Sequence, residues 1–403
     1  MVGDPRPSSV ARSRRGGPLR LVTAVPICDG HDSAITTINL ELARGGAEVI
    51  YLGYHCAASA IARAAVQEDA HAVGLSSYNG GHRVFFREVI GQLRARGGGD
   101  IPVFGGGGGT ITADDERLMR RDGVRQIYGA GTSLDDIVAD VRASFSRRLG
   151  PGARLRGDRA LARAITLAEQ RNGGRGARPR GAAARAAGRT LVVGVAGPGG
   201  AGKSTLIDEL TSRFLRASPT GRVAILANDP SHPGSGGAIL GDRVSAIYAQ
   251  DDRVFFRSLA TRGSPSGLSA TAPAAIEALC ARGEFDLLFV ESIGIGQDGD
   301  PFGVFAGRRR LVDAALFVLP PHYGGRIQLQ KIAMLRGADL VVLNKADQPM
   351  ARAARVELAA QLGGDRAGRP LHATVAVRHA DPGVDRLFGA IERLARIKRG
   401  EAA

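Results

Sequence analysis

Residues 197–205 read GPGGAGKST, and this stretch decides the fold of the second half of the chain. It has the form G-x-x-x-x-G-K-S and follows the apolar run LVVGVA, the setting of a phosphate-binding loop. Glycines let backbone N–H groups turn toward phosphate oxygens, and the following helix adds its dipole. We expect Lys203 to reach the β- and γ-phosphates and Ser204 to bind Mg²⁺. The alternative is a glycine-rich turn without a nucleotide. The predicted nucleotide-binding residues here are Gly197, Gly199, Gly200, Ala201, Gly202, Lys203, Ser204 and Thr205.

A second motif indicates which base is bound. Residues 344–347 read NKAD and follow the predicted strand LVVL. The Asp347 carboxylate can accept two hydrogen bonds from the N1 and N2 edge of guanine, whereas adenine offers no such pair of donors. With Asn344 and Lys345, this residue favours GTP over ATP.

Acidic residues lie at strand ends between these motifs. They are Asp229, Asp242 and Glu291, and a carboxylate at such a strand end can hold Mg²⁺ directly or through water. Glu291 to Gly294 has the form of an Asp-x-x-Gly switch element with Glu in place of Asp. Any one of these acids could instead cap a helix. Gln297, three residues past Gly294, is either a catalytic group or a switch or interface residue.

Strand–helix alternation predicts two parallel α/β sheets. In residues 21–141 the runs LRLVTAVPI, AEVIYLG, HAVGLSS, IPVFGG and VRQIYG predict five strands of a flavodoxin-like domain. Five further runs after Leu191 predict a P-loop GTPase domain over residues 190–403. Residues 1–20 are expected to be a disordered tail. Residues 142–189 are expected to be an Arg/Gly-rich linker with one helix in DRALARAITLAEQ.

The net charge of +15 lies outside the predicted domains. Residues 1–20 hold five Arg and one Asp (+4), and residues 142–189 hold thirteen Arg, one Asp and one Glu (+11). A solvated basic tail and linker therefore explain the charge, with binding to an acidic partner or nucleic acid as the alternative. No apolar run is long enough to span a membrane, and the three cysteines have no disulfide or metal spacing. We expect a cytoplasmic protein that binds neither nucleic acid nor a membrane.

The first predicted domain carries its own site pattern. The stretch DGHD places Asp29 and His31 at the end of the first strand, where open α/β sheets bind ligands. An imidazole can ligate cobalt, and a carboxylate two residues earlier can hold the other ring N–H. An ordinary loop histidine is the alternative. Five glycines, 105–109, end the fourth strand and leave a slot for a flat ring and a nucleotide tail.

The motifs DPSHPGSGGAILGDR, ESIGIGQ and LNKAD resemble the G-protein metallochaperones of cobalamin-dependent acyl-CoA mutases, the MeaB/ArgK-type GTPases, over about residues 158–396. The resemblance implies metal-linked roles for Ser204, Asp229, Asp242 and Glu291. It also implies a mobile loop near GGRIQLQK, with Lys331 as its switch lysine. The resemblance makes Lys203, Glu291, Gln297 and Lys331 the candidate catalytic residues. The stretch DGDPFGVFAGRRR is longer than the family pattern.

The motifs DGHDSA, SSY and GGGGG resemble the cobalamin-binding domain of acyl-CoA mutases. The order of the two domains resembles the front part of fused isobutyryl-CoA mutases. The resemblance implies adenosylcobalamin with a displaced benzimidazole tail, His31 as the lower axial cobalt ligand and Asp29 as its partner. It also implies that Ser76, Gly105, Gly106, Gly107, Gly108 and Gly109 line the tail slot. Where many members have Gly, this chain has Ala34.

The predicted function is a cobalamin-binding GTPase component of an acyl-CoA mutase. The chain leaves no length for a substrate barrel, so we expect a separate barrel subunit as partner. GTP and GDP, an adenosyltransferase and a second copy of the chain are the other expected partners. The alternatives are a cobalamin trafficking or chaperone GTPase and a cobalamin sensor.

Overall fold

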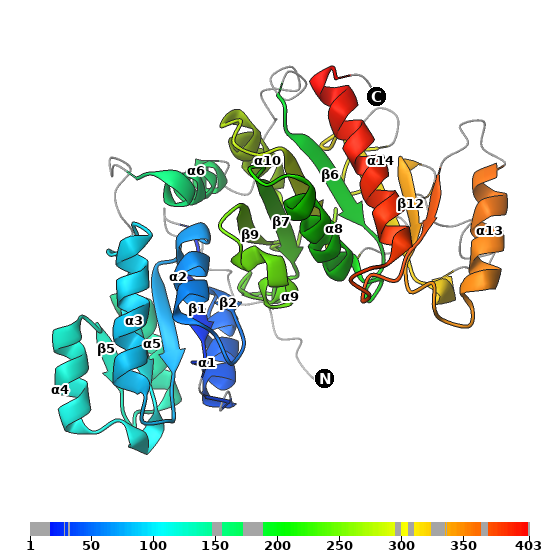
Figure 1. The fold of residues 1–403 in the computed structure, drawn as a ribbon. Helices are drawn as coiled ribbons and strands as arrows, with labels where there is room; N and C mark the ends of the chain where they lie inside the picture. Colours follow the sequence, from blue (N-terminus) through cyan, green and yellow to red (C-terminus); the bar gives the residue numbers. More distant parts are fainter. Residues whose placement is uncertain are drawn as a thin grey trace, which may run out of the picture.

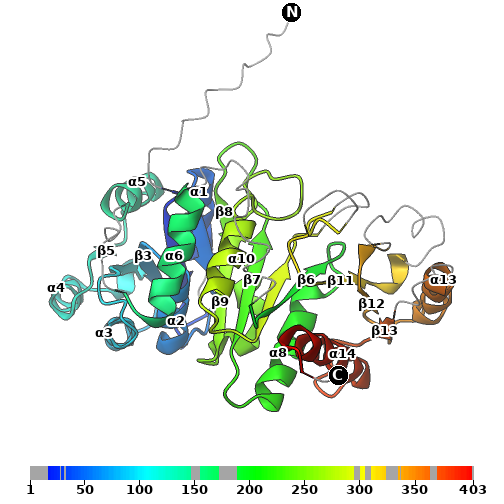
Figure 2. The ribbon, with the colours of Figure 1, turned by 90° about the horizontal axis from the view of Figure 1, so that it is seen from above.

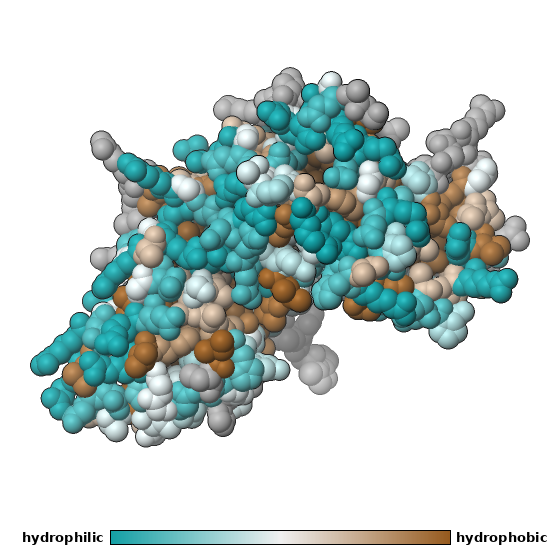
Figure 3. Space-filling model, viewed as in Figure 1, coloured by the Kyte–Doolittle hydropathy of each residue, from teal (hydrophilic) through white to brown (hydrophobic). Residues whose placement is uncertain are grey.

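The computed structural model describes residues 17–27, 29–30, 33–146, 155–171, 188–294, 300–304, 310–323, 335, 337–363 and 370–401. Two parallel α/β units lie side by side, one formed by the first part of the chain and one by the second (Figures 1 and 2). No helix among the described residues is both long and apolar enough to cross a bilayer. The face drawn in Figure 3 is mainly hydrophilic, with small scattered hydrophobic patches, as is usual for a protein surface.

The first unit has the predicted flavodoxin-like architecture. Its sheet has the strand order β5-β4-β3-β1-β2-β8, and every pair is parallel. The strands that the sequence predicts are β1 (Arg20–Ala24), β2 (Glu48–Tyr51), β3 (Ala72–Ser76), β4 (Val103–Gly106) and β5 (Gln126–Tyr128). The helices are α1 (Ser33–Arg44), α2 (Ala58–Gln67), α3 (His82–Ala95), α4 (Ala113–Asp122) and α5 (Leu134–Ser144).

The second unit is built around a seven-stranded sheet with the order β13-β12-β11-β6-β10-β7-β9. Its strands are β6 (Leu191–Ala196), β7 (Val223–Asp229), β9 (Val254–Ala260), β10 (Leu287–Glu291), β11 (Ala314–Leu319), β12 (Leu340–Leu343) and β13 (Leu371–Ala373). β9 and β13 add to the five strands that the sequence predicts. The covering helices include α8 (Lys203–Ala217), α10 (Ala272–Ala281), α13 (Ala351–Gly363) and α14 (Pro382–Arg399).

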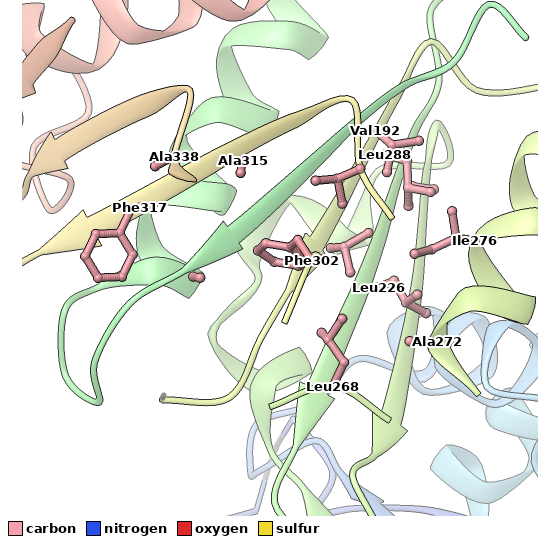
Figure 4. Packing of buried hydrophobic residues seen from close by; sticks show 14 of the residues in the cluster. Val192, Leu226, Leu268, Ala272, Ile276, Leu288, Phe302, Ala315, Phe317 and Ala338 are labelled. Atoms are coloured by element: carbon pink, nitrogen blue, oxygen red, sulfur yellow. The ribbon is translucent and has the colours of Figure 1, made fainter. Parts of the chain in front are cut away.

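Helices cover both faces of this sheet. Leucines and isoleucines of α8 and α14 bury one face, including Leu206, Leu210, Leu387 and Ile391. On the other face α10 packs over residues of β6, β7 and β10, as the close view in Figure 4 shows for Val192, Leu226, Leu288 and Ile276, and α13 lies against β12 and β13. Burial on both faces explains why these strands are nearly continuous apolar runs rather than alternating ones.

The helix predicted within the linker is α6 (Gly157–Arg171), and it is part of the second core. Leu161 and Ile165, one turn apart, pack on the same sheet face as α10. Its polar side pairs with the first unit: Arg159 binds Asp100 at 2.7 Å and Arg163 lies 3.4 Å from Asp69. The expectation that the linker arginines are solvated is therefore wrong for these two. An apolar stripe and a buried ion pair order this segment.

One strand crosses from the second unit to the first. β8 (Ala238–Leu240) pairs in parallel with β2 and becomes the sixth strand of the first sheet. Ala238 and Leu240 are buried in the core of that sheet together with Ile50 and Ile61. The sequence does not predict this strand. It covers the edge of β2, which would otherwise present unpaired N–H and C=O groups.

The two units meet at a set of buried charges that we call the interdomain charge network. Its members are Arg20, Glu48, Glu68, Glu169, Arg243, Arg257 and Arg262. Arg20, assigned to the tail by the sequence analysis, is the first residue of β1 and is only 1% exposed. It binds both Glu48 and Glu68.

Glu68 and Glu48 hold the network from the first unit. Glu68 is fully buried and accepts hydrogen bonds from the Arg20 Nη2 at 2.6 Å and from the Ser258 backbone N–H at 3.1 Å. Burial alone would raise the pKa of Glu48, but the guanidiniums of Arg262 and Arg20 lower it to about 2. The low pKa of Glu48 thus depends in part on Arg262 of the second unit, and Glu68 is hydrogen-bonded to Ser258 of that unit.

Replacing Glu68 with Ala tests this interface. The substitution removes the carboxylate that pairs with the buried guanidinium of Arg243 and one of the two that pair with Arg20, so we expect the free energy of unfolding to fall by ~3–5 kcal/mol. Urea unfolding of the full chain measures it. The matched control is Asp114→Ala, which breaks an exposed ion pair with Arg117 and should leave the stability unchanged. A Glu68→Ala variant as stable as the control would contradict the role of the network.

Candidate functional site

The predicted phosphate loop joins β6 to α8. Gly197, Gly200 and Gly202 have φ values of +156°, +71° and +86°, a region that favours glycine. A Cβ on Gly197 would lie 2.1 Å from the Val318 carbonyl oxygen, so this position also needs glycine for space. The loop thus has the turn and the helix N-terminus that a phosphate group requires.

Lys203 lies across this loop. Its Nζ donates to the carbonyl oxygens of Gly197 at 3.2 Å and Pro198 at 3.3 Å. Burial lowers the pKa of Lys203, whereas the carboxylates of Glu291 and Asp242 raise it. A phosphate would replace weak carbonyl acceptors with charged oxygens, so the lysine is placed to bind an anion.

The three acidic residues at strand ends gather beside the loop. Asp229 ends β7, Asp242 begins α9 (Asp242–Ser245) and Glu291 ends β10. The Ser204 hydroxyl donates to Glu291 Oε1 at 2.8 Å, and the Gly241 N–H donates to Asp229 Oδ1 at 3.2 Å. The buried Asp229 Oδ2 has no hydrogen-bond partner among the described residues. Burial and neighbouring carboxylates, Asp242 foremost, raise the pKa of Asp229 to about 8 and that of Glu291 to about 7.

These residues fit a magnesium ion that arrives with a nucleotide. The described residues contain no group of three His, Cys, Asp or Glu side chains close enough to hold a metal by themselves. Mg²⁺ typically takes one or two protein oxygens and completes its shell with phosphate and water. The Ser204 hydroxyl, an unpartnered carboxylate oxygen and raised pKa values are the donor set that such an ion requires.

The base-recognition motif follows β12. Asn344 is buried and joins two loops: its Nδ2 donates to the Ala201 carbonyl at 2.9 Å, and its Oδ1 accepts from Thr374 and from the Ala376 N–H. Lys345 has a φ of +57°, and Asp347 stays partly exposed with Arg378 3.9 Å away. The structure therefore brings the phosphate loop and the NKAD motif together, as predicted.

Sequence reasoning missed some residues of this site. Asn228 donates to the Glu291 carbonyl at 2.8 Å and accepts from the Ser269 N–H, which fixes the end of β10. Thr374 and Ala376 follow β13, the last strand, and that position at a strand end is the signal that could have revealed them. Gln297 and Lys331 lie outside the described residues.

A second candidate site lies at the carboxyl ends of β3, β4 and β5. It is a cavity of about 250 Å³ lined by Ser76 and Gly105 to Gly108, as predicted, and also by Ala34. Tyr78, the apolar side of α1 and the loop 129–132 complete it, and the sequence analysis did not single these out. Gly109 does not line the cavity, and His31 lies outside the described residues.

The glycines of this cavity have a structural reason as well. A Cβ on Gly105 would lie 2.2 Å from the Leu75 carbonyl oxygen, and one on Gly107 would lie 2.0 Å from that of Ser77. Because the strands approach so closely, no side chain can fill the slot, and it remains open for a ligand tail.

Asp29 ties the first strand to the cavity wall. It is 3% exposed, and its carboxylate accepts a hydrogen bond from the Tyr78 backbone N–H. Asp29 is thereby fixed to the loop after β3. The residues present fit a cobalamin tail, since an open glycine-walled slot lies beside the anchored Asp29.

Comparisons with known proteins bear on both sites. Residues 19–139 match the B12 binding domain, and residues 161–402 match the family described as "Methylmalonyl Co-A mutase-associated GTPase MeaB". Three relatives are called fused isobutyryl-CoA mutase. They come from Geobacillus kaustophilus (36% identical, 93% of this chain, 36% of the relative), Cupriavidus metallidurans (37%, 95% and 36%) and Nocardia farcinica (39%, 92% and 36%). The chain therefore spans little more than a third of the length of these relatives.

The raised carboxyl pKa values predict a pH dependence. Between about pH 4 and 8 the folded, metal-free chain holds protons at Asp229 that the unfolded chain has lost, so rising pH lowers its free energy of unfolding. The substitution Asp229→Asn removes the titrating carboxyl group, so this fall in the free energy of unfolding with rising pH should disappear. We expect the variant to be more stable than the wild type by more than ~1 kcal/mol at about pH 8, with the difference vanishing near pH 4.

Urea unfolding in EDTA across this pH range measures the effect. Mg²⁺ with GDP should stabilise the wild type more at high pH than at low pH, because the ion must displace those protons. Parallel pH profiles for the wild type and Asp229→Asn would contradict the assignment.

Proposed function

Because the chain belongs to the MeaB family of methylmalonyl-CoA mutase-associated GTPases and carries a B12-binding domain before its GTPase domain, we propose that it is the cofactor component of an adenosylcobalamin-dependent acyl-CoA mutase. It binds cobalamin, hydrolyses GTP and uses GTP to gate the loading and repair of the cofactor. The isomerisation, of the methylmalonyl-CoA or isobutyryl-CoA type, requires a substrate-binding barrel outside these 403 residues.

The observation that carries the proposal is that both ligand sites occur in one chain and are linked through one sheet. The glycine-walled cavity lies in the first sheet, and the segment between Asp229 and Asp242 adds the edge strand β8 to that same sheet. Changes at the nucleotide site therefore have a hydrogen-bonded route to the sheet that carries the cavity.

Each site residue has a role in this proposal. Asp29 would orient His31, and His31 would ligate the cobalt of a bound cobalamin. Bound cobalamin supplies the radical chemistry, while this chain orients the cofactor and shields it. At the other site Lys203 neutralises phosphate charge, and Ser204, Asp229, Asp242 and Glu291 hold Mg²⁺. Gln297 and Lys331 are the proposed catalytic residues of the switch loops.

The proposed partners follow from the same division of labour. A separate mutase subunit supplies the barrel, an adenosyltransferase supplies the cofactor, and a second copy of this chain completes a homodimer. GTP and GDP are the exchanging nucleotides, and the cytoplasm is the proposed location.

Titration with adenosylcobalamin tests the first site. We expect the wild type to give the absorbance spectrum of cobalamin with its benzimidazole displaced by a histidine. His31→Ala should lose that spectrum and bind at least about tenfold more weakly, because the axial nitrogen is gone. The control His379→Ala removes an exposed histidine of the second unit and should bind as the wild type does. A wild type without binding would refute the cobalamin role.

Replacing Asp347 with Asn tests the choice of base. An amide nitrogen would face the guanine N–H donors, so we expect GTP affinity to fall by more than about a hundredfold. Xanthosine triphosphate, which carries an oxygen at that edge, should gain affinity. Competition binding with GTP and xanthosine triphosphate measures this change in base preference. Asp114→Asn on α4 is the control. Unchanged GTP affinity would contradict guanine recognition by this carboxylate.

A further inference from the structure

The segment between Asp229 and Asp242 leaves the nucleotide site and docks on the B12-binding domain. Asp229 ends β7, and the chain then forms β8, whose Ala238 N–H donates to the Ala47 carbonyl at 3.0 Å. A Cβ on Gly237 would lie only 2.1 Å from the Ala43 carbonyl oxygen, so the segment is in close backbone contact with the end of α1. Ser235 Oγ adds a bond of 3.1 Å to the same carbonyl. The first unit therefore fixes the path of this segment.

The far end of the segment is anchored by the residue next to Asp242. Arg243 is 7% exposed, and its Nη2 donates to Gln67 Oε1 at 2.7 Å. Its Nη1 donates to Glu68 Oε1 at 3.3 Å and to the Phe256 carbonyl at 2.9 Å. Gln67 is the last residue of α2 and Glu68 follows it, so both acceptor side chains belong to the first unit.

Asp242 depends on this anchor for its position. It begins α9, which has four residues and is too short to be stable without outside contacts. Gly241, the residue before it, donates its N–H to Asp229 Oδ1 at 3.2 Å, so α9 begins beside Asp229 at the nucleotide site. Arg243, the next residue in the sequence, bonds through its guanidinium to Gln67 at the end of α2 and to Glu68 after it.

We propose that Gln67 and Glu68 of the B12-binding domain are positioning residues of the GTPase site, acting through Arg243 and β8 to hold Asp242 and Asp229 where the Mg²⁺–nucleotide complex needs them. The inference rests on the proposed function, since it takes these aspartates as magnesium-linked. It adds that residues of the B12-binding domain hold the magnesium-linked aspartates of the GTPase domain in place. The network contact of Glu48 with Arg262 joins the domains without touching α9, so it does not perform this role.

The test measures magnesium dependence of nucleotide binding in the full chain. A fluorescent GDP analogue is titrated with Mg²⁺ and, separately, in EDTA, using the wild type and Arg243→Met. We expect the variant to need about tenfold more Mg²⁺ for half-saturation, within the usual range of coupling between sites, with unchanged affinity in EDTA. A loss of nucleotide binding in EDTA as well would mean a damaged phosphate loop and would overturn the specific positioning role.

Two further variants sharpen the comparison. Arg243→Lys keeps the charge but loses the planar fork whose two nitrogens reach Glu68 and Gln67 separately, so it should fall between the wild type and Arg243→Met. Arg159→Met is the matched control: it removes another buried arginine that pairs with the first unit, at Asp100, without contacting α9. It should show the wild-type dependence on Mg²⁺. If Arg159→Met weakens Mg²⁺ binding as much as Arg243→Met does, general loosening of the interface is the cause and the inference is wrong.

Hydrogen exchange on the wild type needs no substitution and covers the case in which Arg243→Met fails to fold. The inference expects GDP with Mg²⁺, but not GDP in EDTA, to slow exchange at the Ala238 N–H, which bonds across the boundary. Protection confined to the phosphate loop and β10 would overturn it. A wild type that binds no GDP at all would refute the proposed function, whereas wild-type Mg²⁺ dependence in folded Arg243→Met refutes the positioning role alone.

Discussion

A carboxylate without solvent contact stays ionised only where cations and hydrogen-bond donors replace the water it has lost. Glu68 is in this position at the boundary between the two sheets, and its partners come from β1, α9 and β9. Removing any one element would leave buried charge uncompensated. The first strand, the short helix after Asp242 and the edge of the second sheet must therefore come together, and this requirement fixes the two domains against each other.

At the nucleotide site, by contrast, nearby cations do not balance the carboxylates. The buried Asp229 and Glu291 and the half-buried Asp242 have Lys203 as the nearby cation, and burial and their mutual repulsion raise the pKa values of these carboxyls. A site completed by its ligand should look like this before the ligand arrives. The chain thus pairs its carboxylates where the domains must stay joined, and leaves them unpaired where a metal and phosphates supply the missing interactions.

In the cavity of the first sheet, close contact between backbone segments leaves no room for side chains. At Gly105 and Gly107 the neighbouring carbonyl oxygens leave no room for a Cβ, so the slot is empty because the strands are close. Asp29, bonded to the loop after β3, holds the mouth of this slot. Because the same sheet ends in β8, the cavity and the nucleotide site are connected by one hydrogen-bonded layer.

The sequence by itself determined the features whose chemistry is local. Glycines at fixed spacing before Lys203, the NKAD motif and the apolar runs predict the phosphate loop, the guanine choice and both parallel sheets, because each depends on neighbouring residues. The glycine run 105–109 likewise predicted an open slot, whereas Ser76 was assigned to it only through the resemblance to cobalamin-binding domains. Only the tertiary structure decided that β8 joins the first sheet, that α6 belongs to the second core and that Arg20 and Arg243 are buried. The physical reason is that the sequence of an edge strand, like a single arginine, does not indicate which distant residue it will contact. Ala238 pairs with Glu48 and Arg243 with Gln67 across some 180 residues of chain, and only the packed fold brings them within reach.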